Sequence, residues 1–196
     1  MICAVILSAG ESSRMGSPKA LLPIDGQTFI ERIVEALKQA QVGKIVIVLG
    51  HNAAELKLRI EHLAAEILTN PDYKLGQLSS LQVAVRSLQQ QADCDGMLVH
   101  LVDHPYLKAA LVDQMIQSFY DSKKLIVVPR CGGKRGHPVI FSRGLFDELL
   151  CAPTDQGAKA VVNAHRGETL EIETNEAGIA VDIDTPELYR QYVKGT

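Results

Sequence analysis

Two positively charged side chains, Arg14 and Lys19, lie in a short glycine-containing loop near the start of the sequence. The loop, residues 7–19, reads LSAGESSRMGSPK and follows an apolar run that is typical of a buried strand. Gly10 and Gly16 allow the backbone to turn amide groups toward an anion, and open α/β sheets bind ligands at such strand ends. The types and spacing of these residues therefore predict a site for a polyphosphate.

Two common phosphate-binding motifs do not fit this loop. The P-loop motif, G-x-x-x-x-G-K-[ST], is excluded because five residues separate Gly10 from Gly16, and because Ser17 and Pro18 precede Lys19. The dinucleotide motif, G-x-G-x-x-G, is excluded because residue 12 is serine. The alternative interpretation of the loop, taken alone, is an ordinary strand-to-helix turn with solvated charges.

Carboxylates follow other predicted strands. Asp103 comes directly after the apolar run 96–102, and Asp182 and Asp184 lie two apart on an extended segment, where their side chains face one side. Magnesium prefers hard oxygen ligands and commonly joins one or two carboxylates to substrate phosphates. We therefore predict that Asp103 and a second carboxylate complete a metal site. The alternative is helix capping, by Asp103 for the helix after it and by Asp184 or Thr185 for the last helix.

Two polar loops offer further contacts for anions. Residues 130–138, RCGGKRGHP, combine four basic side chains with three glycines, and we expect them to hold a second anionic substrate. Residues 70–80, NPDYKLGQLSS, place Ser79 and Ser80 at the start of a predicted helix, where hydroxyls and amides contact an anion or a ribose. The alternatives are a solvated basic loop for the first segment and plain N-capping by Ser79 for the second.

No nucleophilic residue lies in a recognisable catalytic motif. The sequence lacks a G-x-S-x-G elbow, and none of its four scattered cysteines has a convincing histidine partner. Cationic glycine loops combined with strand-end carboxylates suit metal-assisted attack on a phosphate. In that chemistry the protein positions the reactants and the substrate supplies the nucleophile.

Strand and helix patterns alternate along the chain and place these residues at strand ends. The alternation predicts one α/β domain, residues 1–196, with a mostly parallel sheet. The expected strands are 2–7, 44–50, 66–69, 96–102, 125–129, 139–141, 169–173 and 179–183, and the expected helices are 29–40, 53–63, 79–91, 107–120, 144–150, 156–165 and a segment after Pro186.

The composition excludes several classes of function. A net charge of −3 leaves no broad basic surface for nucleic acid, and the apolar stretches are shorter than the roughly 20 residues of a membrane span. The first residues lack the basic segment and cleavage site of a signal peptide, and the cysteines form no C-x-x-C pair. We therefore expect a cytoplasmic protein with reduced thiols that binds neither nucleic acid nor membrane.

Several motifs together resemble those of the molybdenum cofactor nucleotidyltransferases, the family of the MobA-like NTP transferase domain. The opening loop is similar to their LAAG/LAGG-x-S-x-RMG-x-x-K loop, and later segments match in order: NPDYKLGQLSSL, LVDHP, GGKRGHPVIF and DIDTPEL. The patterns NP-x4-G-x-x-SSL and RGHPV-x-F are similar to those of the cytidylyltransferase branch, which acts on molybdopterin.

The resemblance implies a three-layer, Rossmann-like nucleotidyltransferase fold of the GT-A-like type. It also implies Mg²⁺-dependent transfer of CMP from CTP to the phosphate of molybdopterin, with release of pyrophosphate; Mn²⁺ is the alternative metal. A molybdoenzyme or its chaperone is implied as a transient partner. By the same resemblance, the catalytic residues are Arg14, Lys19 and Asp103, and the metal ligands are Asp103 and Asp184. The implied nucleotide contacts are Leu7, Ser8, Ala9, Gly10, Arg14, Lys19, Ser79, Ser80 and Asp103, and the implied acceptor contacts are Arg135, Gly136, His137 and Pro138.

Two positions depart from the family pattern. His104 follows Asp103 where the family often has glutamine, and Ser8 lies where alanine or glycine is usual. We expect His104 to affect the acceptor or the pH response, and Ser8 to affect contacts with the base. Three alternative functions stay open: transfer from GTP or ATP, transfer to another phosphorylated acceptor such as a sugar phosphate, and a non-catalytic module that delivers a cofactor.

Overall fold

The computed structural model describes residues 1–194, which form an eight-stranded sheet and a separate two-stranded ribbon. The strands are β1 (Ile2–Ser8), β4 (Lys44–Leu49), β5 (Glu66–Thr69), β6 (Gly96–Leu101), β7 (Ile126–Cys131), β8 (Lys134–Arg135), β9 (Val139–Ser142) and β10 (Thr169–Glu173), with β2 (Pro23–Ile24) and β3 (Gln27–Thr28) forming the ribbon. The sheet order is β10-β7-β9-β6-β1-β4-β5, and β8 pairs with β7. Only β8 and β9 pair antiparallel with their neighbours in this sheet of residues 1–194, so the predicted mostly parallel α/β sheet is confirmed.

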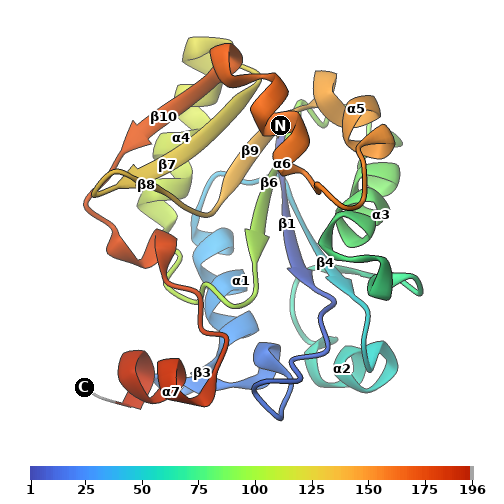
Figure 1. Cartoon of the computed structure of the whole chain (residues 1–196), viewed down its shortest axis with the longest axis vertical. Coiled ribbons are helices and arrows are strands. Elements are labelled where there is room, and N and C mark those ends of the chain that lie inside the picture. The colour runs from blue at the N-terminus through green and yellow to red at the C-terminus, as the bar shows by residue number, and fades with distance from the viewer. Residues whose placement is uncertain (195–196) are drawn as a thin grey trace.

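Helices cover both faces of the sheet and give the fold three layers (Figure 1). Two hydrophobic cores, one on each face, hold the helices against the strands. On one face pack α1 (Phe29–Gln39), α2 (Ala53–Ile60) and α4 (Ala109–Ser122), on the other pack α3 (Gln77–Gln89), α5 (Phe146–Cys151) and α6 (Lys159–Ala164), and α7 (Pro186–Tyr189) lies near the C-terminus.

The first strand contributes to both cores. Side chains alternate along a strand, so Ile2, Ala4 and Ile6 face one core, and Cys3, Val5 and Leu7 face the other. A central parallel strand that is buried on both faces has a continuous run of apolar residues in its sequence. This explains why residues 2–7 carry no polar alternation in the sequence.

The carboxyl ends of β1 and β6 bring two predicted motifs together. The strands are parallel neighbours with Leu7 opposite Leu101, and the N–H of Val102 donates to the Leu7 carbonyl at 3.2 Å. The arrowheads of β1, β4 and β6 point to the same edge of the sheet (Figure 1). The charged loop after β1 and Asp103 after β6 therefore emerge side by side.

The strand expected over 179–183 is wrong. A 3₁₀ helix occupies its first part, and the rest is extended chain outside the sheet. The backbone bonds of this segment are used elsewhere: the N–H of His137 donates to the Ile179 carbonyl and the N–H of Ile183 donates to the Asp103 carbonyl, both at 2.9 Å. The segment thus runs across the end of β6 instead of pairing along it, and this brings the following aspartate to the site.

Helices α3 and α4, for which capping residues were considered, begin at residues other than those expected. α3 starts at Gln77, so Ser79 lies within its first turn and is not its N-cap. α4 starts at Ala109, so Asp103 caps no helix. Thr185 does cap α7, where its hydroxyl accepts a hydrogen bond from the N–H of Leu188 at 3.4 Å. Within residues 1–194 no helix is long and apolar enough to cross a bilayer.

Candidate active site

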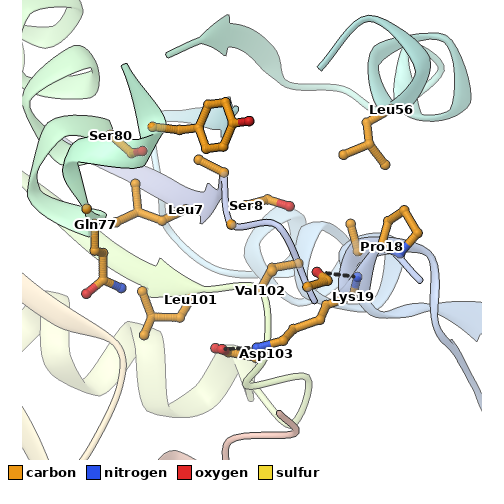
Figure 2. A pocket seen from close by; sticks show the side chains of 16 residues that line it. Leu7, Ser8, Pro18, Lys19, Leu56, Gln77, Ser80, Leu101, Val102 and Asp103 are labelled. Atoms are coloured by element: carbon orange, nitrogen blue, oxygen red, sulfur yellow. Dashed lines mark hydrogen bonds and ion pairs between the residues drawn. The ribbon is translucent and has the colours of Figure 1, made fainter. Parts of the chain in front are cut away.

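A cavity of about 280 Å³ opens at the edge of the sheet where β1 and β6 end. The loop after β1, the end of β6 and the start of α3 enclose it. Leu7, Gln77 and Ser80 lie on one side of this first cavity, and Pro18 and Lys19 lie on the opposite side (Figure 2). The cavity therefore has a charged end and an end formed by the first turn of α3.

The loop after β1 is held in shape by Ser12. Its carbonyl accepts hydrogen bonds from the N–H groups of Met15 and Gly16 at 2.9 and 3.1 Å, and its hydroxyl accepts one from the N–H of Lys19 at 3.2 Å. Ser12 and Gly16 both adopt left-handed backbone angles, with φ of 52° and 73°. Glycine adopts this conformation at little cost, whereas serine does so rarely. The resulting turn directs the Lys19 side chain into the protein.

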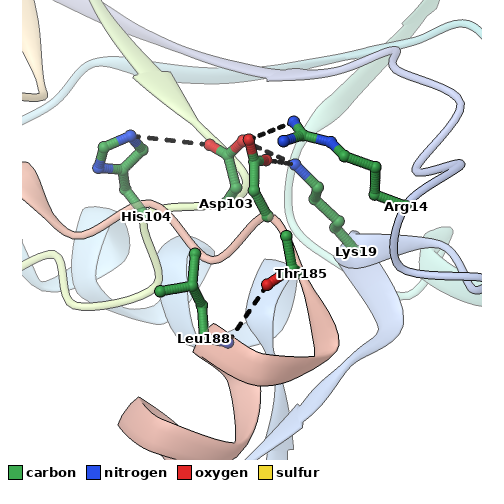
Figure 3. A network of polar contacts seen from close by, with 7 residues as sticks. Arg14, Lys19, Asp103, His104, Thr185 and Leu188 are labelled. Atoms are coloured by element: carbon green, nitrogen blue, oxygen red, sulfur yellow. Dashed lines mark hydrogen bonds and ion pairs between the residues drawn. The ribbon is translucent and has the colours of Figure 1, made fainter.

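Lys19 joins the two carboxylates that were expected to be metal ligands. Its Nζ donates to Asp103 Oδ2 at 3.0 Å and to Asp184 Oδ1, and Arg14 donates to the other oxygen of Asp184 (Figure 3). The side chains of Lys19, Asp103 and Asp184 are only 15, 21 and 20 % exposed, whereas that of Arg14 is 67 % exposed. The structure thus brings the predicted cationic loop and the predicted carboxylates into one network.

The ion pairs keep the network charged at neutral pH. Burial alone would lower the pKa of Lys19, but its bonds with Asp184 and Asp103 outweigh burial and raise that pKa. Burial alone would raise the pKa of Asp184, but Lys19 and Arg14 outweigh it and lower that pKa. Lys19 is therefore an ammonium and Asp184 a carboxylate.

The two carboxylates fit a divalent metal that takes its other ligands from water and phosphate. Asp103 Oδ1 is buried and accepts no hydrogen bond, so a hard oxygen ligand is available. Over residues 1–194, no group of three or more His, Cys, Asp or Glu side chains could hold a metal by itself. Magnesium commonly requires only one or two carboxylates when substrate phosphates supply the rest. Asp182, the other aspartate of the C-terminal motif, is exposed to solvent.

Three histidine rings cluster beside Asp103. The ring centroids of His104 and His137 are 5.1 Å apart, and that of His100 lies 6.2 and 6.5 Å from them. Burial lowers the pKa of His104, and it lowers the pKa of His100 to about 3 and that of His137 to about 4. The rings are therefore neutral at pH 7, and the 3.8 Å between His104 Nε2 and Asp103 Oδ1 is not an ion pair.

A second cavity of about 410 Å³ adjoins the first. Leu7, Gln77 and Leu101 line both cavities. Apolar side chains from the sheet, α3 and α6 form most of the wall of the second cavity; they are Leu7, Leu78, Leu81, Val99, Leu101, Val128, Val139, Phe141, Ala158 and Val162. The second cavity is therefore shaped for a less polar group than the first.

Two cationic side chains line the second cavity, and they differ in whether a carboxylate of the protein already pairs with them. The guanidinium of Arg135 donates to Glu171 Oε1, with Nε at 2.8 Å. Lys159 has no ion-pair partner within residues 1–194. Arg135 is thus already neutralised by a carboxylate, and Lys159 is the cation that can meet an anionic ligand.

The predicted contact residues fall into three groups. Arg14 lies at the outer edge of the charged network through its bond to Asp184. Ser79 and Pro138 line neither cavity, because the Ser79 hydroxyl donates to the Gly76 carbonyl at 2.7 Å and Pro138 is buried. The remaining predicted residues line the cavities: Leu7, Ser8, Ala9, Gly10, Lys19, Ser80 and Asp103 the first, and Arg135, Gly136 and His137 the second.

Other lining residues carry no motif of their own. Tyr73 and Gln77 line the first cavity and lie within the polar segment 70–80, so that segment was the available signal for both. Gln156, Lys159 and Asn163 of the α6 region line the second cavity. These three residues form no recognisable motif, and the α6 region lies far along the chain from the loop after β1, so the sequence did not identify them.

A model of the family described as MobA-like NTP transferase domain matches residues 4–169. Nicotine blue oxidoreductase from Paenarthrobacter nicotinovorans is 29% identical to this chain, and the match covers 96% of this chain and 95% of that protein. Molybdenum cofactor cytidylyltransferase from Escherichia coli (strain K12) is also 29% identical, over 95% of this chain and 92% of that protein. The two names belong to different reaction classes.

Solved structures of the same fold include Rv0371c from Mycobacterium tuberculosis H37Rv. It superposes with a TM-score of 0.87 at 27% identity, covering 98% of this chain and 97% of that one. A structure of Rv0371c complexed with manganese superposes with a TM-score of 0.82 at 25% identity, covering 100% and 99% of the two chains. A divalent metal thus accompanies this fold in a similar protein.

Proposed function

The chain belongs to the MobA-like NTP transferase family and is a nucleotidyltransferase, and on that premise we propose that it transfers CMP from CTP to the phosphate of a molybdopterin-type acceptor. One observation carries the proposal: Lys19 lies between Asp103 and Asp184 at the charged end of one cavity, and a larger apolar cavity adjoins it. The first cavity offers charge for a triphosphate, and the second offers room for a ring system.

In the proposed reaction, an oxygen of the acceptor phosphate attacks the α-phosphorus of CTP. A bond forms between that oxygen and the phosphorus while the bond from the α-phosphorus to the oxygen bridging to the β-phosphate breaks. Pyrophosphate leaves with the electron pair of the broken bond. Asp103 and Asp184 would hold a Mg²⁺ ion, which when bound supplies positive charge against the phosphate oxygens.

Lys19 exchanges its partners in this scheme. Its ammonium is neutralised by Asp103 and Asp184 in the structure, and phosphate oxygens would take the place of these carboxylates at Lys19 when the carboxylates hold Mg²⁺. A cation held in a partly buried position stabilises the charge on the transferring phosphate. The more exposed Arg14 lies at the edge of the network, where it can meet the outer phosphates.

The second cavity suits the acceptor. Its apolar wall, which includes Val99 and Phe141, would pack against a flat ring, and Gln156 and Asn163 would bond polar groups at the ring edge. Lys159 would meet the acceptor phosphate, because it has no ion-pair partner within residues 1–194. Leu7, Gln77 and Leu101 line both cavities, so the two cavities adjoin at these residues.

The relatives support different reactions, and the site favours one of them. The name of the E. coli relative supports CTP and a molybdenum cofactor as substrates. The name nicotine blue oxidoreductase would support a redox reaction. The loop after β1 lacks the dinucleotide motif and instead places Lys19 against two carboxylates, which suits a metal-bound triphosphate better than a redox cofactor.

Pyrophosphate release tests the proposal. We would screen the four ribonucleoside triphosphates against molybdopterin in the presence of Mg²⁺ or Mn²⁺, and we expect release only with CTP and molybdopterin together. Release with another nucleotide or a non-pterin acceptor would keep the transfer reaction and replace its substrates. Nucleotide binding without release, whatever the acceptor, would replace the enzyme by a cofactor-delivery module.

A further inference from the structure

Asn70 is a buried polar residue behind the first cavity. It follows β5, is 2 % exposed, and its backbone N–H donates to the Leu49 carbonyl at 2.7 Å. Its side chain contacts the first turn of α3 at Ser79 and Ser80, which are also buried. A buried polar group is costly unless it is hydrogen-bonded, so the partners of Asn70 define what it does.

Each polar atom of the Asn70 amide has a partner. Nδ2 donates to Ser79 Oγ at 2.8 Å and to Ser80 Oγ at 2.9 Å, and Oδ1 accepts a hydrogen bond from the N–H of Asp72 at 3.0 Å. A backbone N–H can only donate, so it must face the amide oxygen, and this sets the orientation of the amide. Asn70 therefore presents donors, and no acceptor, to the two serine hydroxyls.

The two hydroxyls use their protons differently. Ser79 Oγ lies 2.7 Å from the Gly76 carbonyl and 3.1 Å from the Asp72 carbonyl, so its proton is satisfied inside the protein. Ser80 lines the first cavity, and no group within residues 1–194 accepts its proton. Because Asn70 cannot accept that proton either, the hydroxyl proton of Ser80 stays available to a ligand.

We propose that Asn70 is a positioning residue that keeps Ser80 a hydrogen-bond donor to the nucleobase. The site then takes a base with an acceptor on the facing edge, as cytosine has at O2 and N3. This inference rests on the proposed function, because the first cavity has to hold a nucleotide. The phosphates belong at Lys19, and Ser80 lies on the opposite side of the cavity, which leaves the base beside Ser80 (Figure 2).

The test compares CTP with inorganic tripolyphosphate, which has phosphates but no base. Binding of each to the full chain is measured by titration calorimetry with Mg²⁺, without any acceptor. The first variant is Ser80→Ala, which removes the donor. The second is Asn70→Asp, whose carboxylate accepts the Ser80 proton, so that the Ser80 hydroxyl oxygen presents only lone pairs to the base. We expect each variant to bind CTP about tenfold more weakly, and to bind tripolyphosphate within about twofold of the unaltered protein.

Two further variants separate positioning from a merely structural role. Asn70 acts through Ser80, so adding Asn70→Asp to Ser80→Ala is expected to cause no further loss of CTP affinity. Ser79→Ala is the matched control, since it removes the other hydroxyl that Asn70 holds, and its CTP affinity is expected to stay within about twofold.

Any of three results would overturn the inference. The first is an equal loss of CTP affinity in Ser79→Ala and Ser80→Ala. The second is an equal loss of affinity for tripolyphosphate and for CTP in the Ser80→Ala or Asn70→Asp variant, and the third is no preference of the unaltered protein for CTP over tripolyphosphate. A failure to transfer CMP to molybdopterin would refute the proposed function alone, because no acceptor enters this measurement.

Discussion

The two cavities of the protein are built in different ways. In the first, Lys19 and Asp103 come from short motifs and line the cavity, and Asp184 joins their network through its bond to Lys19. In the second, the wall consists of apolar side chains from β1, β6, β7, β9, α3 and α6. Under the proposed function, a few charged side chains carry the reaction, whereas a wall of mostly apolar side chains from many elements selects the acceptor.

The largest effect is expected from the charged network. Lys19→Ala should lower kcat/KM for pyrophosphate release by about 1,000-fold, because a cation that stabilises the transferring phosphate is lost. Asp103→Ala should lower it to a similar degree. Lys57→Ala is the matched control, since Lys57 is exposed on α2 and lines neither cavity. Activity of Lys19→Ala close to that of Lys57→Ala would place the reaction elsewhere.

The histidine cluster, which reaches from Asp103 of the first cavity to His137 of the second, makes stability depend on pH. His100 has a pKa of about 3 in the fold, against about 6.5 in the unfolded chain. Below about pH 6.5 the unfolded chain therefore binds a proton that folded His100 does not, and the free energy of unfolding falls by about 1.4 kcal/mol per pH unit down to about pH 3.

Urea denaturation at pH 7 and pH 5 measures this effect. His100 should contribute about 2 kcal/mol to the decrease in stability between the two values, and His100→Gln should show a decrease smaller by that amount. Stability above pH 7 should not change through His100, because its ring is then neutral in both states. An identical decrease in the variant would show that His100 is accessible to protons in the fold.

A smaller effect is expected in the second cavity. Lys159→Gln should raise the KM for the acceptor about tenfold and leave the KM for CTP unchanged, because one charge-assisted hydrogen bond to the acceptor is lost. Lys134→Gln is the control, since Lys134 is exposed in the basic loop and lines neither cavity. A rise in the KM for CTP alone would contradict the assignment of the second cavity to the acceptor.

The smallest effect is expected from Arg135. Its guanidinium is paired with Glu171, so Arg135→Gln should change the KM for the acceptor by about twofold or less. Steady-state kinetics with varied acceptor measures the change. A tenfold rise would mean that Arg135 leaves Glu171 to bind the acceptor, and it would confirm the contact expected from the basic loop.

The meeting of Lys19 and Asp103 was predictable from the sequence because both residues follow parallel strands. Apolar runs without alternation indicate buried parallel strands, and the carboxyl ends of such strands meet at one edge. Lys19 and Asp103 do meet in the structure. The strand expected before Asp184 is absent, because that segment is a 3₁₀ helix and extended chain whose backbone bonds go to His137 and Asp103.

The second cavity was predicted only in part. The resemblance implied acceptor contacts for Arg135, Gly136 and His137, and these residues line the second cavity, but charge in a sequence does not reveal that Arg135 pairs with Glu171 of β10. Lys159 reaches the cavity through the packing of α6 on the sheet. Such contacts form when distant elements pack together, and they produce no recognisable pattern in the sequence.

The proposed transfer of CMP is tested best by following the α-phosphate of CTP. With CTP labelled at the α-phosphorus, molybdopterin and Mg²⁺, we expect the label to appear in a pterin dinucleotide and unlabelled pyrophosphate to be released in equal amount. Label that is released as free CMP, or that stays in CTP while the acceptor is present, would contradict the assignment of the two cavities to a nucleotide and its acceptor.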